Sequence, residues 1–144
     1  MSLLFFALGI ASRSAIYNVT DFGAINNGRD LTTIHIQKAI DKCFLEGGGV
    51  VYVPEGEYLV GTLNLKSNVE FLLETGAILK ATTDLSKYQI HNEQPAGVFY
   101  TEDSHDVSIS GSGKIFGQGM EFMYSDSAKV ISGEVNKYIR QGYD

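Results

Sequence analysis

The segment Ser67-Asn-Val-Glu-Phe-Leu-Leu-Glu-Thr-Gly-Ala-Ile-Leu79 decides the fold, because the chain repeats its pattern once. The second, imperfect copy is His105-Asp-Val-Ser-Ile-Ser-Gly-Ser-Gly-Lys-Ile-Phe116. The matched positions are Val69 with Val107, Phe71 with Ile109, Gly76 with Gly113, and Ile78 with Ile115. Each copy predicts a strand, a glycine corner and a second strand. A unit this small cannot bury its apolar face alone, so stacked copies predict a solenoid with one continuous core.

Short runs of strand-forming residues, separated by Gly, Asn and Asp, extend this pattern from Val50 to Gly119. The predicted strands are Val50–Val53, Tyr58–Val60, Thr62–Leu65, Val69–Leu73, Ala77–Leu79, Val98–Tyr100, Val107–Ser110 and Lys114–Phe116. Gly makes up 16 of the 144 residues and Pro only 2, which indicates many tight turns between short elements. The runs and the composition together indicate an all-β fold.

One segment follows a different period and predicts a helix from Thr33 to Glu46. Its apolar residues recur at three- and four-residue spacing and form one stripe of Ile36, Ala39, Ile40 and Cys43. Thr32 or Thr33 is the predicted N-cap, and Gly47-Gly48-Gly49 is the predicted end. The residues expected to face solvent are His35, Gln37, Lys38, Asp41 and Lys42.

Composition excludes several classes of protein. A chain of 144 residues with 44% hydrophobic and 19% charged residues is long enough for one folded domain and is not typical of a disordered one. The formal net charge of −6, without a basic stripe, argues against nucleic acid or an anionic membrane as a partner. The single cysteine, Cys43, excludes an intramolecular disulfide and a cysteine-rich zinc site.

The N-terminus has the composition of a targeting segment. Residues Leu3 to Ala11 form an apolar run that is too short to cross a bilayer but has the length of a signal-peptide core, and small residues follow it. We therefore expect residues 1–15 to be a signal peptide without the usual basic start, and the protein to be secreted or periplasmic. The alternative is an apolar N-terminal strand. No other stretch of the sequence is apolar enough to span a membrane.

Several segments resemble the pectin-active right-handed parallel β-helices. The first three are Tyr17-Asn-Val-Thr-Asp-Phe-Gly-Ala24, Ile36-Gln-Lys-Ala-Ile-Asp41 and Gly47-Gly-Gly-Val-Val-Tyr-Val-Pro54. Three more narrow the resemblance to the polygalacturonases of glycoside hydrolase family 28: Glu57-Tyr-Leu-Val-Gly-Thr-Leu-Asn-Leu-Lys-Ser-Asn-Val69, Thr75-Gly-Ala-Ile-Leu79 and Gly111-Ser-Gly-Lys-Ile-Phe-Gly-Gln-Gly119. The resemblance covers residues 16–119. It implies an all-β, right-handed parallel β-helix whose first coils are closed by an N-terminal capping α-helix. Phe116 departs from the Asp of many relatives, at a position that belongs to a coil corner.

The same resemblance implies a hydrolase of galacturonan, the acidic backbone of pectin. Such enzymes hydrolyse the glycosidic bond with inversion of the anomeric configuration. They use two carboxylates about 6.5–9.5 Å apart and need no metal or other cofactor. In that family the carboxylates come from later coils, in Asn-Thr-Asp and Asp-Asp motifs followed by Gly-His-Gly and Arg-Ile-Lys, and this sequence contains none of these motifs. The chain is therefore interpreted as the N-terminal part of such an enzyme and as inactive alone. It offers no assignable catalytic, substrate-binding or metal-ligating residue.

Some short stretches of the sequence have the composition of functional sites. Glu102-Asp103 with His105-Asp106 brings carboxylates and an imidazole together, but a solvated turn before a strand explains them better. Gly111-Ser-Gly-Lys114 lacks the remaining residues of a phosphate-binding loop. Asn18-Val-Thr20 has the form of a glycosylation acceptor, although it coincides with the opening strand of the resembled fold. His91 and His105 are isolated and are expected at the surface.

Two function classes remain open besides the hydrolase. One is a pectate or rhamnogalacturonan lyase-type relative, which would be expected to hold calcium with a carboxylate cluster that this sequence does not show. The other is a non-catalytic β-helix module that binds carbohydrate by shape. Residues 120–144 are interpreted as a variable loop or the start of further coils, with a weak helix signal from Ala128 to Arg140.

Overall fold

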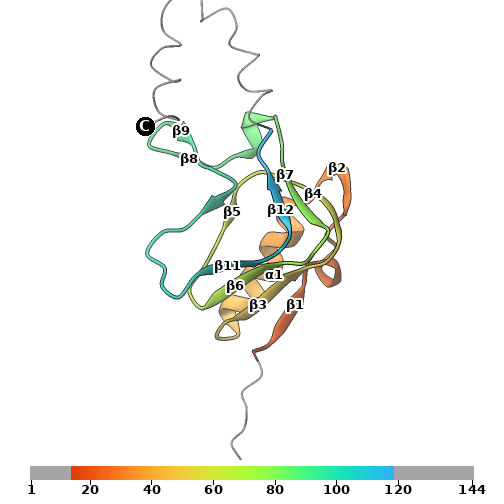
Figure 1. The fold of residues 1–144 in the computed structure, drawn as a ribbon. Coiled ribbons are helices and arrows are strands. Elements are labelled where there is room, and N and C mark those ends of the chain that lie inside the picture. The colour runs from red at the N-terminus through yellow and green to blue at the C-terminus, as the bar shows by residue number, and fades with distance from the viewer. Residues whose placement is uncertain (1–13, 119–144) are drawn as a thin grey trace, which may run out of the picture.

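Residues 14–118 are described by a computed structural model, in which short strands wind into successive coils around one core (Figure 1). An N-terminal layer comprises β1 (Ile16–Asn18), the 3-10 turn η1 (Val19–Phe22), β2 (Asn27–Leu31) and α1 (Thr33–Leu45). Coil 1 comprises β3 (Gly49–Val53), β4 (Gly56–Val60) and β5 (Leu63–Asn64). Coil 2 comprises β6 (Val69–Leu73), β7 (Ala77–Ala81), η2 (Leu85–Lys87), β8 (Ile90–His91), β9 (Gln94–Pro95) and β10 (Phe99–Tyr100). Coil 3 begins with β11 (Ser108–Gly111) and β12 (Lys114–Phe116).

The coils stack so that equivalent strands pair in parallel. One sheet has the order β1-β3-β6-β11, a second has the order β12-β7-β4-β2, and a two-stranded sheet joins β5 to β10. Figure 1 shows β3, β6 and β11 side by side at the bottom of the view, with β4, β7 and β12 rising beside them. Among the strands of residues 14–118, only the small β8–β9 hairpin is antiparallel. The predicted all-β, parallel β-helix is therefore confirmed.

The predicted strands are found within a residue or two, and the elements that were not predicted have no apolar alternation. β2 has the sequence Asn-Gly-Arg-Asp-Leu and is mostly exposed, while β8 and β9 are two residues each. These strands form because a neighbouring backbone offers them hydrogen bonds, not because of their own propensity. The predicted strand Thr62–Leu65 is shorter than expected and comprises only Leu63 and Asn64.

The internal repeat has the predicted register in its first half only. Ile109 pairs with Phe71 as expected, but Ile115 pairs with Leu79, so the predicted match of Ile115 to Ile78 is wrong. Gly113 likewise stands opposite Ala77, not Gly76, because Lys114 pairs with Ile78. The reason is the corner: five steps lead from Leu73 to Ile78, whereas three lead from Gly111 to Lys114. A later corner that is shorter by two residues shifts the register of the strand after it.

The core lies inside the coils and follows the two-residue alternation of the strands. In β6 the side chains of Val69, Phe71 and Leu73 point inward, and in β7 those of Ala77, Leu79 and Ala81 do so. The remaining core residues come from η1, α1, β3, β4 and β5: Val19, Ile36, Ala39, Ile40, Cys43, Val51, Val53, Tyr58, Val60, Leu63 and Leu65. Because inward positions of successive coils lie above one another, each side chain packs against its equivalent in the next coil.

Helix α1 covers the N-terminal end of this core. Its predicted stripe is confirmed, since Ile36, Ala39, Ile40 and Cys43 are completely buried. Its end is also as predicted: Gly48 has a φ of +104° and donates its N–H to the Cys43 carbonyl at 2.8 Å, which terminates the helix. Thr32 occupies the N-cap position but makes no capping bond with its side chain, because its Oγ1 accepts from the Ile25 N–H instead.

The prediction that Gln37 faces solvent is wrong. Its amide group lies along β5, where Nε2 donates to the Asn64 carbonyl at 3.0 Å and Oε1 accepts from the Asn64 N–H at 2.8 Å. The side chain thus supplies the two hydrogen bonds that a further parallel strand would make at this edge. Periodicity places Gln37 outside the apolar stripe but cannot show that a strand edge lies there.

His35 is also less solvated than predicted. It is half-buried, and its ring packs so closely against Gly23 that a Cβ added there would come within 3.1 Å of His35 Cδ2. Its Nδ1 lies 3.4 Å from the Thr32 hydroxyl. The predicted signal peptide at residues 1–15 falls almost entirely outside the described residues, as does the interpretation of residues 120–144, including the helix signal ending at Arg140.

Candidate functional site

The two described corners on either side of β10 are longer than their counterparts in coil 1. Only Gly61 and Thr62 separate β4 from β5, whereas residues 82–98 separate β7 from β10. Four residues, 65–68, lead from β5 to β6, whereas seven, 101–107, lead from β10 to β11. In repeat proteins such insertions map to one face, which is often the face that binds a ligand. The outward face of the β5–β10 sheet is therefore the candidate functional surface.

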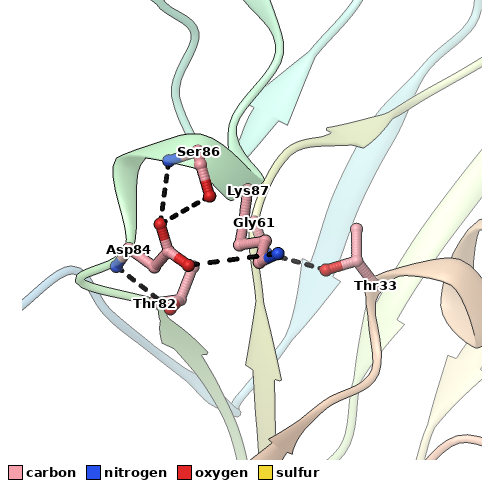
Figure 2. Close-up of polar contacts among 6 residues, drawn as sticks. All are labelled: Thr33, Gly61, Thr82, Asp84, Ser86 and Lys87. Carbon is pink, nitrogen blue, oxygen red and sulfur yellow. Dashed lines mark hydrogen bonds and ion pairs between the residues drawn. The ribbon is translucent and has the colours of Figure 1, made fainter.

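The base of the insertion at residues 82–98 is fixed by local hydrogen bonds (Figure 2). Asp84 caps η2, because its Oδ1 accepts from both the N–H and the hydroxyl of Ser86, at 3.0 and 2.6 Å. The Asp84 N–H in turn donates to Thr82 Oγ1 at 3.2 Å. The hydroxyl of Tyr88 donates to the Thr82 carbonyl at 2.6 Å. These bonds close the start of the insertion into a compact turn on the end of β7.

The insertion is also held against coil 1. The Gly61 N–H donates to Thr33 Oγ1 at 2.8 Å, which joins the coil 1 corner to the first turn of α1 (Figure 2). A Cβ at Gly61 would come within 2.0 Å of the Lys87 carbonyl oxygen, so only glycine permits this close approach of the two corners. The Gln89 N–H then donates to Thr62 Oγ1 at 3.0 Å. These contacts position Gln89 beside the β5–β10 sheet.

A groove of about 340 Å³ lies over this sheet. Its walls come from α1, from coil 1, from the insertion and from the corner after β10. The lining residues are Gln37, Asp41, Asn64, Leu65, Lys66, Gln89, Tyr100, Thr101, Glu102 and Ser104. Asn64 and Tyr100 are direct neighbours in the sheet register and form its floor. We refer to this feature as the β5–β10 groove.

Most of the residues that line the β5–β10 groove are polar. Amide, hydroxyl and charged side chains make up all of its lining except Leu65, and Tyr100 adds an aromatic ring. The Tyr100 hydroxyl lies 3.1 Å from His91 Nδ1, and the two rings are tilted with centroids 5.3 Å apart. Burial, together with the carboxylates of Glu102 and Asp103, raises the pKa of Tyr100 above its usual 10.0, so the hydroxyl stays neutral and can both donate and accept.

In the described part of the chain, the groove contains one ion pair and one carboxylate without a cation partner. Lys66 Nζ lies 2.7 Å from Asp41 Oδ1 and 5.5 Å from the centre of the Phe44 ring. Asp41 Oδ1 also accepts from Gln37 Nε2 at 2.9 Å. Among residues 14–118, no cation lies within ion-pair distance of the Glu102 carboxylate. The groove therefore holds one neutralised cation and one exposed, unpaired carboxylate.

The acidic segment Glu102–Asp106 forms the surface turn that the sequence predicts. Asp103 and Asp106 adopt positive φ angles of 47° and 54°, and all three carboxylates are exposed. The His105 ring contacts Asp106 at 3.0 Å, while the His105 backbone is bonded to Ser67 and Asn68 of coil 1. No group of three or more His, Cys, Asp or Glu side chains within residues 14–118 could hold a metal ion.

The other groupings also have structural roles. Gly111-Ser-Gly-Lys114 forms the corner between β11 and β12 and leads into a strand, not into the helix that a phosphate-binding loop requires. Asn18 caps η1, since its Oδ1 accepts from the N–H and the hydroxyl of Thr20 at 3.0 and 2.8 Å. Within the described part of the chain, no helix is long and apolar enough to cross a membrane.

Comparison with protein families gives one match that spans most of the chain. The model of the rhamnogalacturonase A/epimerase, pectate lyase-like family matches residues 16–132. The chain belongs to this family. The predicted resemblance to polygalacturonase-like proteins is thereby confirmed, and the parallel coils are those of a right-handed β-helix.

Curated relatives of this family member include enzymes that act on different polysaccharides. The chain is 30% identical to a probable polygalacturonase of Vitis vinifera over 127 residues, covering 76% of this chain and 26% of the relative. It is 47% identical to mannuronan C5-epimerase AlgE2 of Azotobacter vinelandii over 64 residues, covering 39% of this chain and 6% of the relative. It is 37% identical to alginate lyase 7 of the same organism over 105 residues, covering 65% and 12%.

Solved structures of similar proteins include two with strong likeness over most of the chain. A putative glycosyl hydrolase of Parabacteroides merdae has a TM-score of 0.72 and 31% identity, covering 83% of this chain and 51% of that one. A hyperthermoactive exopolygalacturonase of Thermotoga maritima has a TM-score of 0.66 and 30% identity, covering 72% and 25%. The chain thus spans only about a quarter of the Vitis and Thermotoga proteins.

The β5–β10 groove was not predicted from the sequence, because its residues form no catalytic or binding motif. Several of them lie in segments that indicate only the fold, and Glu102 lies in a predicted surface turn. One signal was present in the sequence. The predicted strands Ala77–Leu79 and Val98–Tyr100 are separated by a much longer stretch than Tyr58–Val60 and Thr62–Leu65. Unequal spacing between equivalent strands reveals an insertion, although it does not reveal which side chains of the insertion face the sheet.

Proposed function

We propose that this family member forms the capped first coils of a secreted polygalacturonase-like hydrolase, and that the β5–β10 groove binds part of a pectic chain. The observation that supports the proposal most strongly is the groove itself. It lies on the one sheet that both described insertions flank, in coils similar to those of the Thermotoga exopolygalacturonase. Amides, hydroxyls and one aromatic ring are the groups that hydrogen-bond and pack against sugar rings.

The carboxylates of the groove support the proposal that these coils bind substrate and that catalysis takes place elsewhere in the protein. Inverting hydrolysis needs a protonated carboxyl that donates to the leaving oxygen and a carboxylate that activates water on the opposite face of the sugar. In the groove, Asp41 is paired with Lys66, and Glu102 stands on an exposed turn without motif support. We expect the catalytic pair in coils beyond residue 144. Residues 14–118 then close the core, set the register of the strands and hold one end of the substrate.

A uronan lyase or epimerase is the second candidate function. Identity to the Azotobacter alginate lyase and mannuronan epimerase is higher than identity to the Vitis polygalacturonase, although it covers less of the chain. A lyase would break the same type of chain by elimination and leave an unsaturated sugar at the new end. A hydrolase would add water and leave a saturated one. The absorbance of the unsaturated product therefore separates the two reactions for any longer protein that contains these coils.

Binding of pectin by the 144-residue chain tests the role of the groove. In calorimetric titration with oligosaccharides from pectin of mixed esterification, we expect Tyr100→Ala to weaken binding about fivefold or more, the loss of roughly 1 kcal/mol of contacts. Lys38→Ala is the control, because Lys38 is exposed on α1 outside the groove. Equal affinity of Tyr100→Ala and the unmodified chain would contradict the proposed groove.

Activity of the chain tests the proposed location of the catalytic carboxylates. We expect the purified 144-residue chain to release no reducing ends from polygalacturonate. Turnover that is abolished by Glu102→Gln or Asp103→Asn would show that the surface turn after β10 is catalytic. That result would overturn the assignment of the carboxylates to later coils while leaving the binding experiment unaffected.

A further inference from the structure

We infer that the β5–β10 groove selects an uncharged pectic sugar unit over a galacturonate carboxylate, and that Asp41 and Glu102 determine this selectivity. The inference rests on the proposed function, because it assumes that the groove binds a pectic chain. It goes beyond that function by naming the chemical form of the unit bound. Galacturonate becomes uncharged when its carboxylate is methyl-esterified, and pectins also contain neutral sugars.

The first observation is the sign of the charge that the groove presents. Among the described residues that line it, Lys66 is the single cation, whereas Asp41 and Glu102 are both acidic. The remaining polar lining consists of uncharged groups, including the amides of Asn64 and Gln89. The groove therefore carries one net negative charge, and a bound carboxylate would add a second.

The second observation is that the single cation is already engaged. Lys66 Nζ lies 2.7 Å from Asp41 Oδ1, and the same ammonium group lies over the Phe44 ring. Gln37 holds the Asp41 carboxylate in this position. Its Nε2 donates to Asp41, and its amide group is also bonded to the backbone of Asn64. A uronate that contacts Lys66 would share an ammonium group whose charge Asp41 already offsets, so it gains less than it would from a free cation.

The third observation concerns Glu102. Its carboxylate has no cation within ion-pair distance among residues 14–118, so no cation neutralises its charge there. The neighbouring Tyr100 hydroxyl, whose pKa is raised by burial and by this carboxylate, is a neutral donor and leaves the negative charge in place. At separations near 4 Å, two like charges in a solvated site repel by about 1 kcal/mol, which corresponds to about a fivefold change in affinity. An uncharged unit avoids this repulsion and still hydrogen-bonds to the amides and hydroxyls.

Calorimetric titration of the 144-residue chain with three matched trisaccharides tests the inference: trigalacturonate, its methyl ester, and a neutral galactose trisaccharide. At low ionic strength we expect the ester to bind about threefold to tenfold more tightly than the acid. The difference should shrink in about 0.5 M salt, because screening removes repulsion between exposed charges. Tighter binding of the ester than of the galactose trisaccharide would identify an esterified unit, and the reverse order would identify a neutral sugar. Equal affinity for both would show that the absence of charge is what the groove selects.

Two variants assign the selectivity to residues. Glu102→Gln should raise the affinity for trigalacturonate about threefold to tenfold and so reduce the preference for the ester over the acid. Asp41→Asn should act in the same direction by releasing Lys66. Glu93→Gln is the matched control, because it removes an equal charge at the exposed turn of the β8–β9 hairpin outside the groove.

The outcomes separate the two proposals. Tighter binding of trigalacturonate than of its ester by the unmodified chain, or no response of acid binding to Glu102→Gln, would overturn the inferred selectivity while leaving the groove as a pectin site. Failure of all three ligands to bind would overturn the proposed function of the groove and the inferred selectivity together.

Discussion

Coil 1 and coil 2 have the same paired strands and differ in the corners that connect them. β3 pairs with β6 and β4 pairs with β7 over five residues each, without an interruption of register. Between the second and third strands, however, coil 1 uses Gly61 and Thr62, and coil 2 uses residues 82–98. The core fixes the length and register of the paired strands, because inward side chains of successive coils must pack against one another. The corners face solvent and can lengthen, and here they build the walls of the β5–β10 groove.

The largest expected effect is on the cap that both coils need. Ile40→Asp places a carboxylate without a partner at a completely buried position on α1, which should destabilise the protein by about 3–5 kcal/mol. Chemical denaturation monitored by circular dichroism measures the change. Ile34→Asp is the control on the same helix, since Ile34 is 61% exposed, and it should change the stability by less than about 0.5 kcal/mol. A reversible transition that Ile40→Asp leaves unchanged would contradict the capped core.

The next largest effect is expected where the corner of coil 1 contacts the insertion of coil 2. Gly61→Ala puts a methyl group within 2.0 Å of the Lys87 carbonyl oxygen, so the insertion must move away from coil 1. We expect a loss of about 1–3 kcal/mol in stability, and weaker pectin binding because Gln89 leaves the groove wall. Gly97→Ala serves as the control within the same insertion, because its nearest neighbour would lie 3.7 Å away. Unchanged binding by Gly61→Ala would show that the two corners are independent.

A smaller effect is expected at the outer edge of coil 1. Gln37→Met keeps the length of the side chain but removes both hydrogen bonds to Asn64, which should cost about 1–2 kcal/mol because two backbone groups of β5 lose their partners. Hydrogen exchange of the Asn64 amide should accelerate more than that of Val69 in β6. Lys38→Met at the exposed neighbouring position provides the comparison. If Asn64 exchange does not respond, Gln37 does not replace a strand at this edge.

The smallest effect concerns one interior position at which the coils differ. Tyr58 of coil 1 pairs with Leu79 of coil 2, and the Tyr58 hydroxyl is buried without a hydrogen-bond partner among residues 14–118. Burial, the main cause, raises the pKa of Tyr58 above its usual 10.0, so the group remains neutral. Tyr58→Phe removes this unpaired group and should stabilise the protein by up to about 1 kcal/mol, measured as a higher denaturation midpoint. Destabilisation would indicate that the hydroxyl is bonded in solution.

Much of this fold could be predicted because its signals are local. Alternation marked β6 and β7, three- and four-residue spacing marked α1, and glycines marked the helix end. The failures share one physical cause, which is contact with a backbone distant in sequence. Gln37 was assigned to solvent, β2 was not predicted, and Ile115 was matched to the wrong neighbour, because each depends on a strand edge or corner length that no local pattern contains.

The sequence by itself determined the repeated strand–corner–strand unit and the capping helix, because burial of apolar side chains gives the chain a regular spacing of apolar residues. The family followed from the resemblance of its motif segments. Only the tertiary structure decided the functional surface. Lys66, Asp41 and Glu102 lie on three segments whose proximity depends on how the coils stack, and Gln89 enters the groove only because Gly61 lets the insertion approach coil 1. Charge pairing and groove shape arise from contacts across coils, and residues that meet in this way need no regular spacing along the sequence.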